Sequence, residues 1–412
     1  MIDGKFLKNI FGEINRKRMK STVKYSKLTL VVILCVNSII NAQTVKPPIM
    51  GWSSWNHFHI NIDENSIMGQ ADAMVSSGMK DAGYQFINTD DGFFGGRDSI
   101  TGKLYCHPVK FPSGMRLLSD YIRSKGLIPG IYSDAGKNTC GSKYDKDPHG
   151  FGVGMYNYLE NDANTFFVDW NFDFIKIDWC GGKWLNLNEE TEYTKIINGI
   201  HKVKPDARIN VCRWEYPGKW VEKIADSWRI SGDIRENFGS IKKIIDLAAD
   251  TYKYSSPGHY NDLDMLQVGR GMSYDEDKTH FTMWCFMNSP LLAGNDLRKM
   301  SEQTIAVLTN KEVIALNQDK GFYQGRRLAV IKESGLEIWE KKLGENQEGL
   351  AIVLYNPTGK EIAYTLKSET IGVKKDTPIR DLWLHQDLGE IGKSKTFTVP
   401  KHGVVVFKTL KK

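Results

Sequence analysis

Short apolar runs alternate with amphipathic segments along the chain from Pro48 to about residue 320. The apolar runs are rich in β-branched residues and are bounded by polar or turn residues, as is typical of buried strands. Between several of them, apolar positions recur three and four residues apart, as on one face of a helix. The predicted strands span residues 49–55, 84–91, 127–134, 172–179, 208–214, 227–234, 259–266 and 289–296, and the predicted helices include 67–83, 115–126, 189–203 and 241–254. This alternation predicts a parallel (β/α)8 TIM barrel, a fold of the α/β class.

The pattern changes after Gly321, where apolar and polar residues alternate in short runs separated by Gly, Asn and Pro. A period of two is typical of strands with one buried face. The runs read RRLAVIKE, LEIWEKKL, GLAIVLYN, EIAYTLKS, IRDLWLH and KTFTVPKHGVVVFKTL. They predict a C-terminal antiparallel β-sandwich of about 90 residues, in which we find no set of catalytic residues. Two domains also suit a chain of 412 residues, which is more than one hydrophobic core usually serves.

The N-terminal region differs from both patterns. Residues 1–27 carry eight Lys or Arg and two acids, and residues 28–42 form an uncharged, mainly apolar run that ends at Ala42. A basic region, a short apolar region and a small residue together predict a secretory signal peptide, cleaved between Ala42 and Gln43. Met19 is an alternative start that gives a basic region of more ordinary length. We therefore expect a secreted or periplasmic protein.

Charge and length narrow the function further. The net charge of residues 1–27 equals the +6 of the whole chain, so the remainder is neutral, which argues against a nucleic-acid partner. The apolar run is too short to span a membrane. Leu34 stands before Cys35 where a lipidation signal needs a small residue, so we expect no lipid anchor. The predicted segments are a signal peptide at 1–42, a catalytic barrel at 43–320 and a β-sandwich at 321–412.

Acidic and amide side chains gather at the carboxyl ends of the predicted barrel strands. They are Asp90, Asp91, Asp134, Asp178, Asp233, Asp262, Asp264, Asn295 and Asp296. In a (β/α)8 barrel this end of the strands holds the active site, whereas packing there needs no carboxylates. The pattern predicts an enzyme that works with carboxyl groups.

Two of these carboxylates have distinctive neighbours. In FDFIKIDWCGG, residues 172–182, the isoleucines face one way and Lys176 and Asp178 the other. Asp233 shares its strand parity with Arg229 in WRISGD. A cation two residues before a carboxylate favours the ionised form that a nucleophile needs. An acid that holds a proton near neutrality needs burial or a second carboxylate instead, and a structural ion pair is the alternative for either residue.

Six motifs in this order resemble those of glycoside hydrolase family 27, the α-galactosidase and α-N-acetylgalactosaminidase family. They read PPIMGWSSWNHF, INTDDGF, GIYSDAGKNTC, FIKIDWC, WRISGD and PGHYNDLDML, and they cover the chain from about residue 47 to 296. The resemblance implies that Asp178 is the nucleophile and Asp233 the acid/base of a mechanism that retains anomeric configuration. It also implies a disulfide between Cys140 and Cys180, and no metal or organic cofactor. Sugar contacts are implied for Trp55, Asp90, Asp91, Tyr132, Lys176, Arg229 and Asp264.

The chain departs from the family in two places. Members often carry a second disulfide, and its two positions hold His59 and Gly92 here. After the fifth strand many members read C-E-W, with the Glu contacting the sugar 2-hydroxyl, whereas this chain reads CRWEYPG. Arg213 therefore stands at a predicted substrate-binding position, yet a guanidinium cannot accept a hydrogen bond. Recognition at the 2-position stays open, with Glu215 as an alternative acceptor.

The sequence thus predicts a retaining exo-glycosidase that releases terminal α-linked galactose from oligosaccharides or glycoconjugates. An α-N-acetylgalactosaminidase and a β-L-arabinopyranosidase are alternatives within the enzyme class, and a non-catalytic sugar-binding barrel protein is the alternative outside it. The expected partner is a glycan substrate, and a homodimer is left open. We interpret His107 as a loop residue and KTHFTMWCFMNSP, residues 278–290, as helix core. Cys285 is expected to stay reduced, and no pairing is indicated for Cys106 or Cys212.

Overall fold

The computed structural model describes residues 45–411, and nearly all of them belong to one compact unit that begins at Pro47. The predicted signal peptide, with its cleavage site and the alternative start, lies outside the described residues. Eight strands form one sheet in the order β10-β1-β2-β5-β6-β7-β8-β9, and every neighbouring pair is parallel. The strands are β1 (Met50–Ser53), β2 (Phe86–Asn88), β5 (Ile128–Asp134), β6 (Phe174–Asp178), β7 (Arg208–Cys212), β8 (Ser227–Arg229), β9 (Tyr260–Asp262) and β10 (Leu291–Ala293).

The sheet closes on itself just beyond β9. Leu266 pairs in parallel with Ala293 of β10. Its amide donates to Leu292 O at 2.7 Å, and its carbonyl accepts from Gly294 N at 3.0 Å. These bonds join the last strand in the ring to β10 and complete a barrel, which confirms the predicted (β/α)8 architecture.

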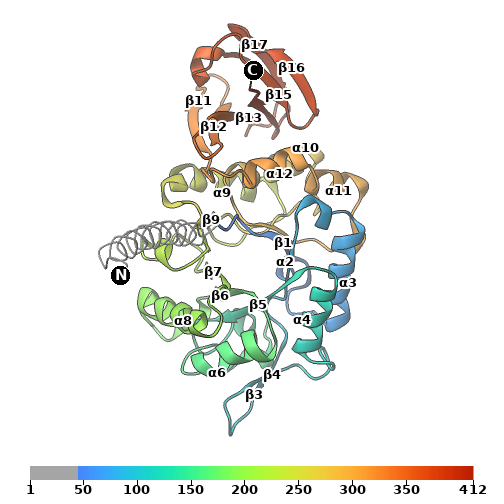
Figure 1. Cartoon of the computed structure of the whole chain (residues 1–412), viewed down its shortest axis with the longest axis vertical. Coiled ribbons are helices and arrows are strands. Elements are labelled where there is room, and N and C mark those ends of the chain that lie inside the picture. Colours follow the sequence, from blue (N-terminus) through green and yellow to red (C-terminus); the bar gives the residue numbers. More distant parts are fainter. Residues whose placement is uncertain (1–44, 412) are drawn as a thin grey trace, which may run out of the picture. The chain divides into compact units, whose positions relative to one another are not determined.

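Helices lie around the outside of the strands (Figure 1). The four predicted helices are present as α3 (Glu64–Ser76), α4 (Met115–Ser124), α8 (Glu189–Val203) and α9 (Phe238–Thr251). Their starts follow local chemistry: Asp63, Asn188 and Asn237 each accept a backbone N–H of the first turn. Capping side chains therefore mark the starts of three of these helices, whereas α4 follows Gly114 and has no such cap.

The described elements differ from the prediction at several ends. All eight barrel strands are shorter than predicted, and β8 ends at Arg229, so Asp233 lies in the following loop and strand parity does not place it. A hairpin of β3 (Phe94–Arg97) and β4 (Leu104–Cys106) was not predicted. Its first strand reads FGGR, and paired glycines give no hydrophobic alternation for a sequence pattern to show.

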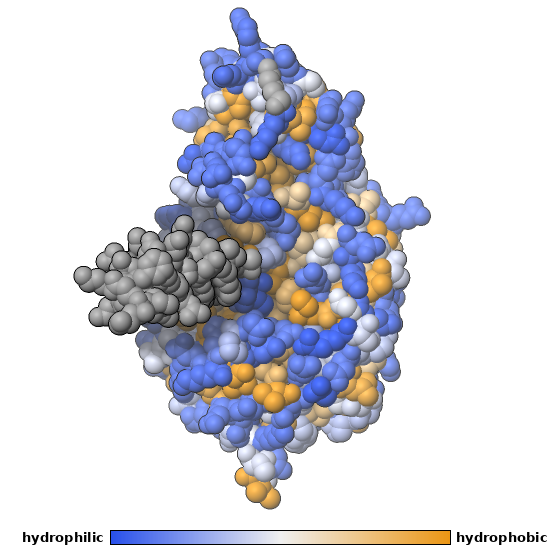
Figure 2. All heavy atoms as spheres, viewed as in Figure 1, coloured by the Kyte–Doolittle hydropathy of each residue, from blue (hydrophilic) through white to orange (hydrophobic). Residues whose placement is uncertain are grey.

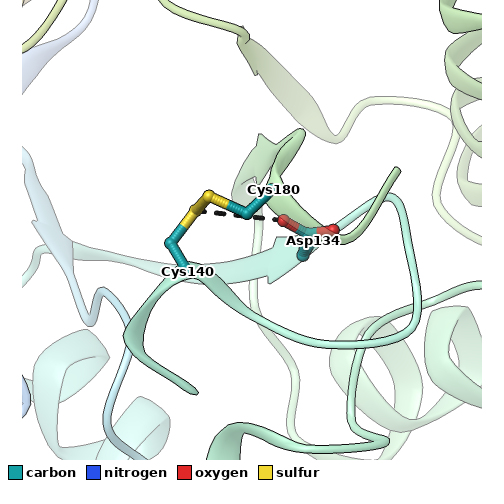
Figure 3. Close-up of side chains that lie close together, drawn as sticks. All are labelled: Asp134, Cys140 and Cys180. Atoms are coloured by element: carbon teal, nitrogen blue, oxygen red, sulfur yellow. Dashed lines mark hydrogen bonds between the residues drawn. A yellow bond between two sulfur atoms is a disulfide. The ribbon is translucent and has the colours of Figure 1, made fainter. Parts of the chain in front are cut away.

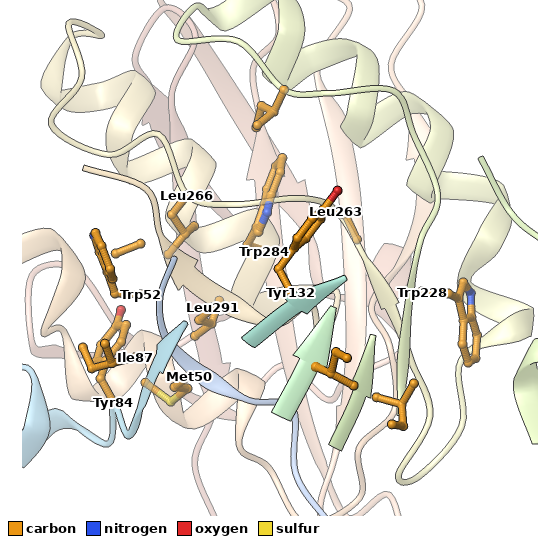
Figure 4. Packing of buried hydrophobic residues seen from close by; sticks show 14 of the residues in the cluster. Met50, Trp52, Tyr84, Ile87, Tyr132, Trp228, Leu263, Leu266, Trp284 and Leu291 are labelled. Carbon is orange, nitrogen blue, oxygen red and sulfur yellow. The ribbon is translucent and has the colours of Figure 1, made fainter. Parts of the chain in front are cut away.

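Large apolar side chains fill the space between the strands and the surrounding helices (Figure 4). Trp52, Tyr84 and Leu263 have no exposed surface. On β6 the two isoleucines are fully buried in this core, whereas Lys176 lines a cavity. The predicted division of this strand into an apolar and a charged face is confirmed.

The C-terminal strands form a six-stranded sheet in the order β11-β12-β13-β18-β15-β16 and a two-stranded sheet of β14 and β17. Their bounds are β11 Arg326–Val330, β12 Glu337–Leu343, β13 Gly349–Tyr355, β14 Ile362–Lys367, β15 Pro378–Asp381, β16 Gln386–Glu390, β17 Ser394–Val399 and β18 Val404–Thr409. All neighbouring pairs are antiparallel. They share a hydrophobic core of their own. β16 was not predicted, because QDLGE offers only one apolar residue.

Side chains of β15 and of the turn after it reach two helices that follow the barrel strands, α10 (Tyr274–Phe286) and α12 (Lys311–Asn317). Trp383 Nε1 donates to Thr282 Oγ1 at 2.9 Å, and Arg380 contacts both oxygens of Glu312 at 2.7 and 2.8 Å. Met283, Trp284, Cys285 and Met287 are fully buried. The interpretation of this segment as helix core is thereby confirmed.

Hydrophilic residues cover most of the face shown in Figure 2, with apolar residues scattered among them. Between residues 45 and 411, none of the helices combines the length and the apolar character needed to cross a bilayer.

Candidate active site

A cavity of about 340 Å³ opens at the carboxyl ends of the barrel strands. Most of the predicted site residues line it: Trp55, Lys176, Asp178, Arg229, Asp233 and Asp264, together with Cys140 and Cys180. They come from five different strands or the loops that follow them. The fold therefore brings together side chains that lie more than 200 residues apart in sequence.

Asp178 is the last residue of β6, and its carboxylate is buried. Lys176 Nζ lies 3.6 Å from Asp178 Oδ1 and 3.1 Å from Asp90 Oδ2, so two carboxylates share one ammonium group. Cys212 stands at the paired position of β7, and its thiol is one of the groups that lower the pKa of Asp178. The ammonium group of Lys176 thus holds the Asp178 and Asp90 carboxylates near each other.

Burial and neighbouring charges shift the pKa values of Asp178 and Lys176 in opposite directions. Burial raises the pKa of Asp178 to about 6, although Lys176 acts in the opposite direction. Burial alone would lower the pKa of Lys176, but the charges of Asp178 and Asp90 raise it well above its ordinary value. The lysine therefore stays charged, and Asp178 is largely ionised above pH 6.

Asp233 is the exposed carboxylate of the site, with 67% of its side chain accessible. Arg229 Nη2 donates to Asp233 Oδ1 at 3.0 Å, and the Trp214 side chain is a further group that lowers the pKa of Asp233. Partial desolvation acts to raise the pKa of Asp233, but the charges of Arg229 and Lys176 outweigh it and lower that pKa. Without a sugar bound, Asp233 is thus the stronger acid of the two carboxyl groups.

Asp264 holds Arg229 in place. Its backbone adopts φ +78°, a left-handed conformation that costs a non-glycine residue about 1–2 kcal/mol. Trp284 Nε1 donates to its carbonyl at 2.7 Å, and Ile234 N donates to its Oδ2 at 2.9 Å. The same Oδ2 lies 2.7 Å from Arg229 Nη2. These contacts hold Asp264 in its strained conformation. Asp264 in turn orients the Arg229 guanidinium, which also binds Asp233.

A disulfide joins Cys140 and Cys180 beside the nucleophile candidate. Cys140 Sγ lies 3.2 Å from Asp178 Oδ2. Figure 3 shows the disulfide next to Asp134, the last residue of β5. Because the two sulfur atoms are bonded to each other, this cluster offers no thiolate to a metal ion. The disulfide has the predicted pairing. Cys106, Cys212 and Cys285 are free among the described residues, and a reduced Cys285 in the exported protein stays a prediction.

Comparison with known proteins agrees with this geometry. The family model described as alpha galactosidase A matches residues 47–319. The chain belongs to this family. A second model, described as the alpha galactosidase C-terminal beta sandwich domain, matches residues 333–409.

Individual relatives extend the similarity over most of the chain. The chain is 39% identical over 390 residues to alpha-galactosidase A of Cellvibrio japonicus, and the match covers 89% of this chain and 92% of that protein. It is 37% identical over 360 residues to an alpha-galactosidase of Oryza sativa, covering 86% and 83%. The crystal structure of alpha-galactosidase I from Mortierella vinacea superposes with a TM-score of 0.82 at 31% identity, covering 90% of this chain and 98% of that one.

Not every residue that the family resemblance implied lies on the cavity surface. Asp90 lines a smaller cavity of about 20 Å³ that shares Lys176, Arg229 and Asp264 with the main one. Tyr132 is buried beneath Lys176, whose Nζ lies 5.3 Å from the ring centroid.

Asp91 is also buried, and both its oxygens accept backbone N–H groups, from Gly92 and Gly141. Burial raises the pKa of Asp91 to about 7. Sugar contacts by these residues stay predictions.

Arg213 is directed into ion pairs. Its Nε lies 2.7 Å from Glu189 and its Nη1 2.9 Å from Glu215. The loop residue that lines the cavity is Trp214, which adopts φ +68°. The family resemblance pointed to Arg213, the position before Trp214. The backbone conformation that brings Trp214 into the cavity has no signal in the sequence.

Further cavity residues were also missed. Asn56, Tyr144, Lys183, Trp184 and Met265 line the cavity without having been predicted. Cys212 was noted only as a thiol without an evident partner, yet it pairs with Asp178 across β6 and β7 and acts to lower the pKa of that carboxyl group. The cysteine's place at the end of a barrel strand beside β6 was the available signal, since strand ends at this rim face the site.

We expect Trp214→Ala to change recognition of the sugar 2-substituent more than Arg213→Ala does, because only the indole is on the cavity surface. Removing the indole should lower kcat/KM for nitrophenyl α-galactoside roughly tenfold. It should also alter the ratio of this kcat/KM to the kcat/KM for the N-acetyl analogue. Steady-state kinetics of both variants on both substrates check this. A larger change of the ratio in Arg213→Ala would instead place the guanidinium in the sugar subsite.

The two pKa directions predict an acidic activity optimum. If Asp178 is the nucleophile and Asp233 the acid/base, as the family resemblance implies, catalysis needs ionised Asp178 with protonated Asp233, which is a singly protonated form of the pair. The pair loses its last proton as pH rises through about 6, the pKa of Asp178. We therefore expect kcat/KM to fall roughly tenfold per pH unit above that value. A profile that stays flat between pH 6 and 8 would contradict this arrangement of charges.

Proposed function

We propose that this chain is a retaining exo-α-galactosidase that releases terminal α-linked galactose from oligosaccharides or glycoconjugates by double displacement. The observation that carries the proposal is the pairing of a buried, lysine-bound carboxylate with an exposed, arginine-bound one in a single cavity. Asp178 and Asp233 have these two settings. Two carboxyl groups on opposite sides of a sugar ring are what retaining hydrolysis requires.

In the first step, an Asp178 oxygen forms a bond to the anomeric carbon while the bond from that carbon to the leaving oxygen breaks. Asp233 transfers its proton to the leaving oxygen, so the departing sugar leaves as a neutral alcohol. In the second step, Asp233 takes a proton from water, the resulting hydroxyl oxygen attacks the anomeric carbon, and the bond to Asp178 breaks. Two inversions give net retention.

Surrounding charges fit these roles. Lys176 faces Asp178 and Asp90, so its ammonium stabilises the carboxylate that leaves in the second step. Arg229 lies between Asp233 and Asp264, and it stabilises Asp233 after its proton has gone. A sugar that fills the cavity and displaces water would strengthen both interactions.

Assays of nitrophenyl α-galactoside, its N-acetyl analogue and nitrophenyl β-L-arabinopyranoside side by side test the proposal. We expect the α-galactoside to have the highest kcat/KM. A preference for either other substrate would assign the chain to an α-N-acetylgalactosaminidase or a β-L-arabinopyranosidase. Binding without turnover of any of them would favour the non-catalytic alternative.

We further propose that residues 43–320 form the catalytic barrel and 321–412 the sandwich, and that residues 1–42 direct export to the periplasm or the medium. The first family match ends at residue 319 and the second begins at residue 333, which supports this division. N-terminal sequencing of the exported protein tests the cleavage after Ala42. The homodimer stays a prediction, which light scattering on the purified protein checks.

A further inference from the structure

The disulfide joins two short helices that have the same sequence pattern. Helix α5 (Cys140–Tyr144) reads CGSKY, and helix α7 (Cys180–Trp184) reads CGGKW. In each, the first three residues are buried and the lysine and the aromatic residue are exposed. Residues four apart lie on one face of a helix. The tethered cysteines therefore place an aromatic ring one turn further along each helix.

Both helices are anchored in the same way at their second residue. Gly141 N donates to Asp91 Oδ2 at 2.9 Å, and Gly181 N donates to Asp134 Oδ1 at 2.9 Å. A Cβ at Gly141 would lie 2.7 Å from that Asp91 oxygen, and one at Gly181 would lie 2.5 Å from a backbone oxygen. Larger residues would push the helices off these anchors. Buried carboxylates and a covalent bond thus fix the positions of both helices.

The anchored helices present two rings at the cavity. Tyr144 and Trp184 line it, yet 68% of Tyr144 and 36% of Trp184 stay accessible. Their ring centroids lie 6.4 Å apart, and Lys143 Nζ lies 5.3 Å from the Trp184 ring and 6.0 Å from that of Tyr144. We call Tyr144 and Trp184 the aromatic platform. Exposed aromatic rings at a cavity mouth leave a large apolar area uncovered.

We propose that the aromatic platform is the subsite for the leaving-group sugar, and that the Cys140–Cys180 disulfide holds it in register with the nucleophile. This inference rests on the proposed function. The cysteine of α7 follows Asp178 by two residues, and Cys140 Sγ contacts the Asp178 carboxylate. The platform and the nucleophile are therefore positioned by one covalent unit.

The chemistry of the platform defines the class of ligand. A pyranose ring whose C–H groups lie on one face can stack on an indole or phenol ring, and its hydroxyls then point sideways. Lys183, which also lines the cavity, can donate to such a hydroxyl. The expected substrates are α-galactosides whose leaving group is itself a hexose, rather than a small alcohol.

The test compares two substrates that differ only in the leaving group. Galactosyl-α-1,6-glucose places a hexose on the platform, whereas α-galactosyl fluoride has a leaving atom that cannot touch it. We expect Trp184→Ala to lower kcat/KM for the disaccharide roughly tenfold more than for the fluoride. Trp184→Phe, which keeps a ring, should recover most of that difference.

Two further variants complete the experiment. Cys140→Ala/Cys180→Ala should lower the disaccharide-to-fluoride ratio of kcat/KM as Trp184→Ala does, because the two helices lose their covalent link. An effect on Asp178 itself acts on both substrates, so the ratio cancels it. Tyr274→Ala is the matched control, since Tyr274 is also exposed, has Lys278 Nζ 4.8 Å from its ring, and lies on α10. Its ratio should equal that of the wild type.

The outcomes separate this inference from the proposed function. Equal losses on both substrates in Trp184→Ala would overturn the platform's role in binding the leaving group. An unchanged ratio in the double cysteine variant would overturn the role of the disulfide. A wild-type protein that does not hydrolyse α-galactosyl fluoride would contradict the proposed function instead.

Discussion

Asp178→Ala is expected to lower kcat for nitrophenyl α-galactoside by roughly 10⁵-fold or more. Without this carboxylate no covalent intermediate can form. The loss should be equally large for good and poor leaving groups, because every substrate needs the same attack. Stopped and continuous assays of nitrophenolate release measure it over this range.

A matched control distinguishes loss of the nucleophile from loss of a buried charge. Asp162 is also buried, and its Oδ1 lies 2.6 Å from Arg97 Nη1, outside the cavity. Asp162→Ala should lower the melting temperature but leave kcat within a few-fold of the wild type. Near-normal turnover by Asp178→Ala would remove its assignment as the nucleophile.

Asp233→Ala is expected to separate substrates by leaving group. For an unactivated disaccharide we expect a loss of roughly 10²–10⁴-fold, the usual contribution of a general acid. For dinitrophenyl α-galactoside the first step should be spared, since dinitrophenolate leaves without a proton. Burst kinetics should then show accumulation of the intermediate, because no general base activates the water.

The pH dependence of this variant should be the reverse of that of the wild type. With Asp233 absent, only ionisation of Asp178 matters, so activity on the dinitrophenyl substrate should rise with pH and reach a plateau. The charge of Asp233 contributes to the raised pKa of Asp178, so the rise should lie somewhat below pH 6. Equal losses on both substrates would argue that Asp233 does not donate the proton.

The sequence was informative wherever periodicity and strand ends determine position. The alternation in FIKID predicted that Lys176 and Asp178 share a face, and the structure places their charged groups 3.6 Å apart. Strand–helix alternation predicted the barrel, because a parallel sheet of this length has few other solutions. The disulfide followed from family resemblance rather than from spacing.

Other features depend on tertiary contacts that no local pattern encodes. Asp233 lies beyond the end of β8, so Arg229 reaches it through loop geometry and not through strand parity. The sequence did not show which carboxyl group is buried; the structure shows that it is Asp178, whose pKa is therefore the raised one. The repeated CGxK-aromatic pattern was visible in the sequence, but its meaning depends on the disulfide that pairs the two helices.

The stereochemistry of azide rescue tests the central claim most directly, namely that Asp178 is the nucleophile and Asp233 the acid/base. Azide added to Asp178→Ala should attack from the vacated side and give β-galactosyl azide, the inverted product. Azide added to Asp233→Ala with the dinitrophenyl substrate should attack the intermediate and give α-galactosyl azide, with overall retention. The anomeric proton coupling in the NMR spectrum of each product distinguishes the two. The account predicts opposite configurations in this order, and exchanged configurations would contradict it.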